Sequence, residues 1–133
     1  MNRLFLDANV LFSAAYRSDA GLLRLWKLKN ALLLSSRYAV AEARINLTDE
    51  DQRQRLARLS ADLHLVEASQ TALPRGIALP EKDVPVFLAA IEGRSTHLLT
   101  GDLRHFGPYL GKKVEGIKIM LPGEYLRMQI QNA

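Results

Sequence analysis

The sequence predicts an α/β fold, arranged as a three-layer α/β/α sandwich with a mainly parallel sheet of about five strands. Short apolar runs alternate along the chain with segments that repeat apolar residues at helical spacing, which is typical of such folds. The first run, at residues 4–6, is apolar at consecutive positions, as expected of a strand buried on both faces. At 133 residues the chain fits a single domain, which we expect to span residues 1–133.

In the first half we place strands at 3–6 and 31–34 and helical segments at about 10–15, 20–29, 35–45 and 48–63. Ser35 and Ser36 can begin the third of these helices. Thr48 is expected to be the N-cap of the fourth. The acidic residues 49–51 then fall in the first turn, where they complement the helix dipole, so we interpret them as structural.

In the second half we place strands at 64–67, 96–100 and 117–121, a helix at about 84–93, and a last short helix that begins at Pro122. A loop at 74–80, which contains proline and glycine, separates the third strand from the helix that follows. Asp83 precedes Val84 and Pro85. This order is typical of an N-cap followed by proline in the first turn, and capping alone would explain Asp83.

Composition restricts the classes of function. The chain has no cysteine, which excludes disulfides, thiolate nucleophiles and zinc ribbons. It shows no signal-peptide pattern and no run of 18 apolar residues, so we expect a cytoplasmic protein without a membrane span. The net charge of +4 and the pI of about 9.6 would attract a polyanion.

Two carboxylates follow predicted strands directly. Asp7 ends the first strand, and Asp102 follows the run that ends in Thr100 and Gly101. The carboxyl ends of parallel strands meet at one edge of a sheet, where α/β folds bind ligands, so these two acids would face each other across a crevice. This placement outlines a metal site.

Structural alternatives exist for each of these residues. Asp7 or Asn9 could cap the helix that follows, and the Asn9 amide could also orient the Asp7 carboxylate. Asp102 could form an Asx-type turn. Thr100 could hydrogen-bond a carboxylate or a metal-bound water, or could simply be a strand residue. We favour a functional role for Asp7 and Asp102 because the two acids occur in the same context.

Glu42 lies among small and apolar residues, in the stretch Tyr38 to Ala43. An isolated glutamate there could be a ligand. It could equally be solvated or paired with Arg44, because helical periodicity allows one polar face. The sequence leaves these two interpretations of Glu42 equally balanced.

The order of these acids resembles that of the PIN domain, a small α/β nuclease fold found in toxin halves of bacterial toxin/antitoxin pairs and in RNA-processing enzymes. FLDANVLFSA resembles the opening motif, YAVAEARINL the following helix, and DVPVFLAAIEGRSTHLLTGDLRHF the later pair of acids. IKIMLPGEYL is similar to the closing strand and helix. The resemblance covers nearly the whole chain. It implies that Asp7, Glu42, Asp83 and Asp102 are both catalytic residues and metal ligands, with Asn9 and Thr100 in support.

Oxygen ligands of this kind favour Mg²⁺ or Mn²⁺ over zinc. Crowded carboxylates raise one another's pKa, so we expect a site that is disordered or partly protonated in the absence of metal. The metal would bind a phosphate oxygen, activate a water and stabilise the leaving 3′ oxygen. The resemblance thus implies an endoribonuclease that leaves a 5′-phosphate and a 3′-hydroxyl.

The resemblance also implies the toxin of a type II pair, a protein antitoxin as partner and a homodimer. Arg104 and His105 follow Asp102 closely, and we expect them to contact substrate phosphate. A hydrogen-bonding role for His105 is favoured over metal ligation. The alternative to an enzyme is a catalytically silent PIN-fold module that binds RNA or a protein. A phosphoaspartyl protein is disfavoured because Asn9 stands where the phosphatase motif has a second Asp.

Overall fold

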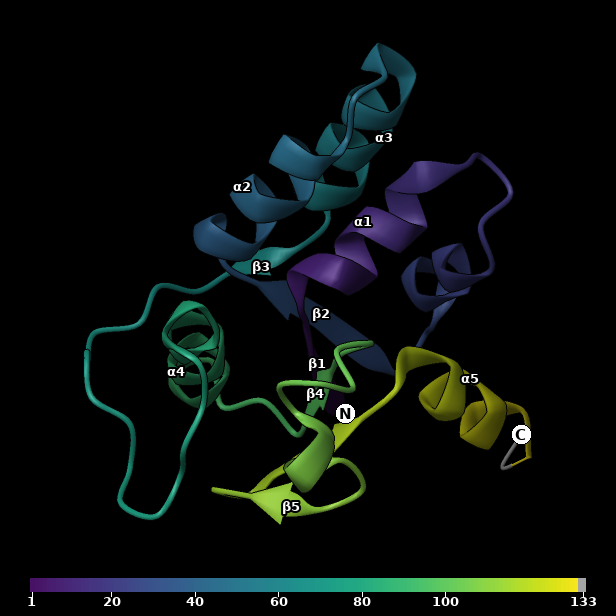
Figure 1. The fold of residues 1–133 in the computed structure, drawn as a ribbon. Helices are drawn as coiled ribbons and strands as arrows, with labels where there is room; N and C mark the ends of the chain where they lie inside the picture. Colours follow the sequence, from purple (N-terminus) through teal and green to yellow (C-terminus); the bar gives the residue numbers. More distant parts are fainter. Residues whose placement is uncertain (132–133) are drawn as a thin grey trace.

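A six-stranded sheet forms the middle of the molecule, as seen in the computed structural model, which describes residues 1–131 (Figure 1). The strand order is β3-β2-β1-β4-β6-β5. The strands are β1 (Asn2–Leu6), β2 (Ala31–Ser35), β3 (His64–Leu65), β4 (His97–Leu99), β5 (Lys113–Val114) and β6 (Ile117–Met120). Neighbouring strands are parallel except for β5, which pairs antiparallel with β6. The α/β class and the mainly parallel sheet are therefore as predicted.

The direction in which the sheet grows reverses beside β1. From β1 the chain adds β2 and then β3 on one side, and it returns to place β4 on the other side. Leu6 of β1 aligns with Leu99 of β4, so both strands end at the same level. The backbone N–H of Asp7 donates to the carbonyl of Leu99 at 3.1 Å, which ties the two strand ends together. In α/β folds a crevice at this kind of position is where ligands bind.

Helices cover both faces of the sheet. The elements are α1 (Ala8–Tyr16), η1 (Gly21–Lys27), α2 (Arg37–Asn46), α3 (Glu50–Ala61), η2 (Glu81–Asp83), α4 (Val84–Glu92), η3 (Gly107–Tyr109) and α5 (Pro122–Gln131). One face packs against α1, α2, α3, η1 and α5, and α1 contacts both α2 and α3. The other face packs against α4 and the segment around Phe106. This arrangement gives the three layers, α/β/α, that the sequence predicts (Figure 1).

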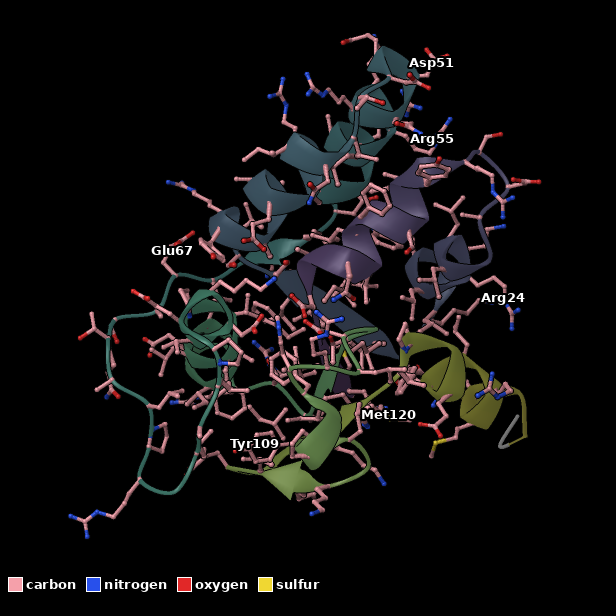
Figure 2. The ribbon with its side chains drawn as sticks, viewed as in Figure 1. Arg24, Asp51, Arg55, Glu67, Tyr109 and Met120 are labelled. Atoms are coloured by element: carbon pink, nitrogen blue, oxygen red, sulfur yellow. The ribbon has the colours of Figure 1, made fainter. Side chains whose placement is uncertain are left out.

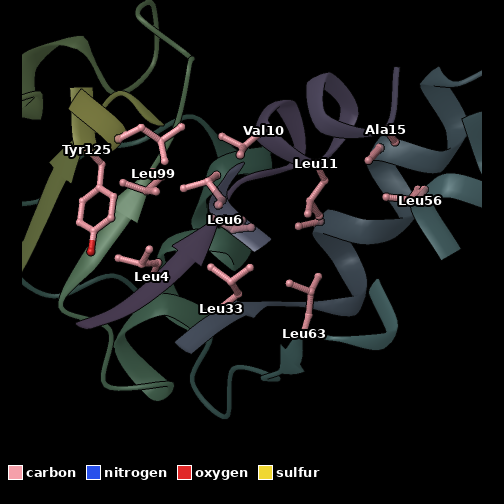
Figure 3. Packing of buried hydrophobic residues seen from close by; sticks show 14 of the residues in the cluster. Leu4, Leu6, Val10, Leu11, Ala15, Leu33, Leu56, Leu63, Leu99 and Tyr125 are labelled. Atoms are coloured by element: carbon pink, nitrogen blue, oxygen red, sulfur yellow. The ribbon is translucent and has the colours of Figure 1, made fainter. Parts of the chain in front are cut away.

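The strands supply side chains to both layers, as the consecutive apolar residues predict. Leu4 and Leu6 point into the core under α1, whereas Phe5 between them points toward α4. Figure 3 shows Leu4 and Leu6 beside Leu33 and Leu99 of the neighbouring strands. Each fully buried leucine of this kind contributes about 1.5–3 kcal/mol. The two-sided core makes the end of β1 a rigid support for Asp7.

Several details differ from the predictions. The N-cap of α3 is Asp49 and not Thr48, and the Gln52 side chain accepts a hydrogen bond from the Asp49 backbone N–H at 3.3 Å. The segment predicted as a helix at 20–29 is the 3-10 helix η1, and the third strand is shorter than expected. The short strand β5 was not predicted.

The predicted start of α2 is confirmed. Ser36 is the N-cap of α2, and its hydroxyl accepts from the Ala39 N–H at 3.1 Å. Within η1, Leu25 is buried in the core and Trp26 packs against it. Asp51, at the start of α3, and Arg24 lie on the outside of the molecule (Figure 2). None of the helices within residues 1–131 is long and apolar enough to cross a membrane.

Candidate functional site

An open pocket of about 570 Å³ lies where β1 and β4 end. It is lined by Asp7, Ala8, Asn9, Phe12, Glu42, Asn46, Lys82, Asp83, Gly101 and Asp102. All four acids singled out in the sequence are in this lining. They come from four separate segments: the ends of β1 and η2, the middle of α2, and the loop after β4. The fold therefore gathers residues that lie as much as 95 positions apart (Asp7 to Asp102).

Asp7 is buried, with 4% of its surface exposed, yet both carboxylate oxygens accept hydrogen bonds. Oδ1 accepts from the Ala8 backbone N–H at 2.7 Å, so Asp7 does cap α1. Oδ2 accepts from the Thr100 hydroxyl at 2.8 Å and from the Asn9 amide at 3.2 Å. Asp7 therefore caps α1 with Oδ1 and is held in its orientation within the pocket through Oδ2.

Asn9 and Thr100 connect the two strand ends. The Asn9 Oδ1 accepts from the Gly101 N–H at 2.7 Å, and its amide also donates to the Thr100 hydroxyl at 3.3 Å. The same hydroxyl accepts from the Asp102 N–H at 3.1 Å. These hydrogen bonds fix the position of Asp7 relative to the start of the loop that carries Asp102.

Asp83 is at the N-cap position of α4, but its side chain makes no capping hydrogen bond. Capping alone therefore does not explain this residue. Its carboxylate is buried, with 6% of the residue exposed, and faces the pocket. The Oδ2 atom lies 2.8 Å from the His105 Nδ1 but has no aligned hydrogen-bond partner. A buried carboxylate oxygen without a partner is a feature that a bound cation would explain.

Asp102 uses its two oxygens differently. Oδ1 accepts from the backbone N–H groups of Arg104 at 3.1 Å and His105 at 3.0 Å, which is the Asx-type turn considered from the sequence. Oδ2 lies 2.8 Å from the His105 Nδ1. Because Nδ1 carries at most one hydrogen, it cannot align with both Asp83 and Asp102, and it has no aligned partner at all. The three side chains converge without satisfying one another.

Glu42 is half-buried on α2 and lines the pocket. None of the ion pairs formed within residues 1–131 involves Glu42, so pairing with Arg44 is not its role. One turn along the helix, Asn46 also lines the pocket, and its amide donates to the Glu42 carbonyl at 3.1 Å. The pocket interpretation of Glu42 is therefore better supported than solvation.

Burial and neighbouring charges raise the pKa of two of the acids. Burial raises the pKa of the Asp7 carboxyl above its usual range, and the nearby charges of Asp83 and Asp102 add to this. Burial also raises the pKa of Asp83, as do Asp102 and Glu42, whereas His105 and Lys82 oppose the shift. Both pKa values are raised, which agrees with the expectation of a partly protonated site without metal.

The two residues expected to contact phosphate are placed differently. Arg104 is exposed, and His105 lies against the acids; neither is in the lining of the pocket. Lys82, Phe12 and Asn46 are in the lining but were not predicted as site residues. Helical spacing could have indicated two of them, because Asn46 is four residues after Glu42 and Phe12 is four after Ala8.

The donor set fits a divalent cation. Carboxylate oxygens converge from several segments, and one of them, Oδ2 of Asp83, is buried without a partner. Asp83, Asp102 and His105 each offer an atom within 4.8 Å of the others. Oxygen donors suit Mg²⁺ and Mn²⁺, and the imidazole adds a donor that transition metals accept.

Comparison with known proteins adds no family assignment. The chain matches no family model, and no curated protein matches it at a significant level. The resemblance to the PIN domain thus remains a prediction from the sequence motifs.

Proposed function

We propose that this chain is a metal-dependent endoribonuclease of the PIN type, which hydrolyses RNA phosphodiester bonds with Mg²⁺ or Mn²⁺ as cofactor. The observation that carries the proposal is the convergence of Asp7, Glu42, Asp83 and Asp102 in one open pocket. The pocket lies at the reversal point of a parallel sheet, where ligands are expected to bind.

In this proposal, the four acids hold the cation. When bound, the metal would supply Lewis-acid activation of a water and stabilisation of the charge that develops on phosphate. Thr100 and Asn9 keep the Asp7 carboxylate in place by donating to its Oδ2. Asp102 is held through its Oδ1 by the turn that follows it. The acids are thus positioned before a cation arrives, which reduces the reorganisation that binding requires.

RNA suits the charge distribution of the molecule. The chain carries a net charge of +4 even though it concentrates acids in the pocket, so positive charge predominates elsewhere. Such a field attracts a polyanion at long range. Lys82, in the pocket lining, and the exposed Arg104 are the basic residues we propose for phosphate contact near the acids.

Cleavage of a mixed pool of structured RNAs tests the proposal. The purified protein is assayed with Mn²⁺ or Mg²⁺, with EDTA, and as the Asp7→Asn and Asp19→Asn variants. Asp19 is an exposed acid paired with Arg17, so Asp19→Asn removes the same charge away from the pocket. We expect metal-dependent cleavage that produces 5′-phosphate ends, that survives Asp19→Asn, and that Asp7→Asn abolishes.

The absence of cleavage by folded protein under all metal conditions would contradict the enzymatic proposal. RNA binding without cleavage would instead favour the catalytically silent module. Cleavage that EDTA and Asp7→Asn leave intact would exclude this pocket as its source.

We also propose, from the resemblance alone, that the chain is the toxin of a type II pair, acts in the cytoplasm as a homodimer and is covered by an antitoxin protein. Expression of the wild type and of Asp7→Asn in the same bacterial host tests the toxin role. Growth arrest by the wild type alone is the expected result. Equal growth of both strains at equal protein levels would contradict it.

A further inference from the structure

His105 occupies a position that its expected role does not explain. The chain has three histidines, and His105 is the one whose Nδ1 lies 2.8 Å from two carboxylate oxygens, Asp83 Oδ2 and Asp102 Oδ2. A phosphate contact would require the ring to face the open pocket. The ring is instead directed at the acids, and its Nδ1 is buried.

The three atoms are not a satisfied hydrogen-bonded group. Asp83 Oδ2 and His105 Nδ1 are both buried without an aligned partner. Asp83 is more than nine-tenths buried, and its carboxylate faces this point. A buried donor or acceptor without a hydrogen-bond partner destabilises the folded state, so two of them at one point require an explanation.

The spacing matches the coordination of a metal ion. For ligand distances of about 2.0–2.2 Å, two neighbouring ligands of an octahedral ion are about 3 Å apart. Both distances from Nδ1 to the carboxylate oxygens, 2.8 Å each, are close to this value. Each of the three residues also offers a ligand atom within 4.8 Å of those of the other two, as ligands of one ion must.

The backbone holds the ring in this position. Asp102 Oδ1 accepts from the His105 backbone N–H at 3.0 Å. This bond fixes the His105 backbone next to the Asp102 carboxylate, whose other oxygen, Oδ2, lies beside the His105 ring. The next residue, Phe106, is fully buried in the core beside α4, and its N–H donates to the Asp102 carbonyl at 3.2 Å. The loop is therefore anchored on both sides of the imidazole.

We propose that His105 Nδ1 is a metal ligand together with Asp83 Oδ2 and Asp102 Oδ2, and that it makes this group of three side chains select a divalent transition-metal ion such as Mn²⁺ over Mg²⁺. Imidazole nitrogen is a good donor for transition metals, whereas Mg²⁺ strongly prefers oxygen. The inference rests on the metal binding of the proposed function but not on RNA cleavage.

Pulsed electron paramagnetic resonance of the full chain loaded with Mn²⁺ tests the nitrogen ligand directly. The wild type is expected to show a coupling between Mn²⁺ and ¹⁴N that changes to the ¹⁵N pattern when histidine alone is ¹⁵N-labelled. His105→Asn should lose the coupling. His64→Gln, at an exposed position on β3, should keep it.

Titration calorimetry tests the selectivity. We expect His105→Asn to weaken Mn²⁺ binding roughly tenfold or more, since even outer partners of ligands contribute 10- to 100-fold. Mg²⁺ binding should change less. His64→Gln should leave both affinities as in the wild type.

Bound Mn²⁺ without histidine nitrogen coupling in the wild type would overturn the inference, as would coupling that persists in His105→Asn. The labelling experiment needs no variant, so it gives an answer even if a substitution impairs folding. Nitrogen coupling without RNA cleavage would support the inference and count against the nuclease. RNA cleavage without nitrogen coupling would support the nuclease and contradict the role of His105 as a ligand.

Discussion

Asp7 and Asp83 are buried carboxyl groups that the folded chain keeps close to other acids. Burial is the main cause that raises the pKa of each, and neighbouring acids add to it. A folded protein that binds a proton more tightly than its unfolded chain loses stability as the pH rises through the shifted range. The site is therefore expected to oppose folding at neutral pH when no cation is present.

The first prediction concerns this pH dependence. Both acids have a folded-state pKa above the ordinary value of 3.8, so the native state binds more protons between 3.8 and the raised values. As the pH rises through this window, metal-free wild type should lose stability relative to Asp83→Asn, which cannot ionise at that position. Urea unfolding of both proteins in metal-free buffer from about pH 4 to 7 measures the difference. A difference that is constant across this range would contradict the prediction.

Thr100 gives a second prediction at the scale of single residues. Its hydroxyl donates to Asp7 Oδ2 and accepts from the Asp102 N–H, so it positions two acids at once. Thr100→Val keeps the shape and removes these two bonds together with the one that the hydroxyl accepts from the Asn9 amide. We expect about 1–3 kcal/mol of lost stability and a loss of Mn²⁺ affinity of roughly 10- to 100-fold.

Thr96→Val is the matched control for Thr100→Val. The Thr96 hydroxyl bonds to the backbone of Arg3 at the other end of β4, away from the acids. This variant should also lose stability but should bind Mn²⁺ as the wild type does. Calorimetric titration and urea unfolding separate the two effects. Equal Mn²⁺ affinities in the two variants would contradict a positioning role for Thr100.

At the scale of elements, two helices begin in different ways. The Ser36 hydroxyl accepts the Ala39 N–H at the start of α2, whereas the Asp83 carboxylate makes no such bond at the start of α4. Pro85 in the first turn of α4 reduces the number of N–H groups that need a partner. The structure thus leaves the Asp83 side chain free of a capping function and available to the pocket.

The third prediction follows from this contrast. Ser36→Ala should reduce the free energy of unfolding by about 1 kcal/mol, as loss of a cap does. Asp83→Ala should leave metal-free protein at least as stable as the wild type at neutral pH, because it removes a buried charge and no cap. Urea unfolding at pH 7 in EDTA measures both. A loss of stability in Asp83→Ala similar to that in Ser36→Ala would contradict the prediction.

The elements also show which signals a sequence carries. Consecutive apolar residues in β1 and β2 predicted strands buried on two faces, and both strands are there. The two-residue strand β5 has no such run, because its pairing with β6 is set by the turn at residues 115–116, where both φ angles are positive. At the start of α3, Thr48 and Asp49 are both good caps, and local pattern alone could not choose between them.

At the scale of the whole molecule, the meeting of Asp7 and Asp102 was predictable from the strand ends, whereas the places of Glu42 and Asp83 in the pocket were expected only from the resemblance. The strand ends indicated that Asp7 and Asp102 would meet, and the alignment of β1 with β4 places them so. Nothing in the sequence reports the direction of the His105 ring, which depends on how Phe106 anchors the loop in the core. The sequence likewise could not show whether the Asp83 side chain caps α4 or faces the pocket, because this depends on side-chain geometry.

The last prediction joins the site to global stability. Because the pKa values of Asp7 and Asp83 are raised, their carboxylates oppose folding at neutral pH, and a cation that binds only the folded state must stabilise the whole chain. At 100 times its dissociation constant, such an ion adds about 2.7 kcal/mol, which corresponds to a rise in Tm of roughly 10 °C for a chain of this size. Thermal unfolding of the wild type with EDTA and with increasing Mn²⁺ measures the rise, and the Asp7→Asn and Asp83→Asn variants should show a much smaller one. Asp19→Asn should respond like the wild type, because its carboxylate is exposed and outside the pocket. An equal rise in all four proteins would mean that Mn²⁺ stabilises the fold somewhere other than at these acids.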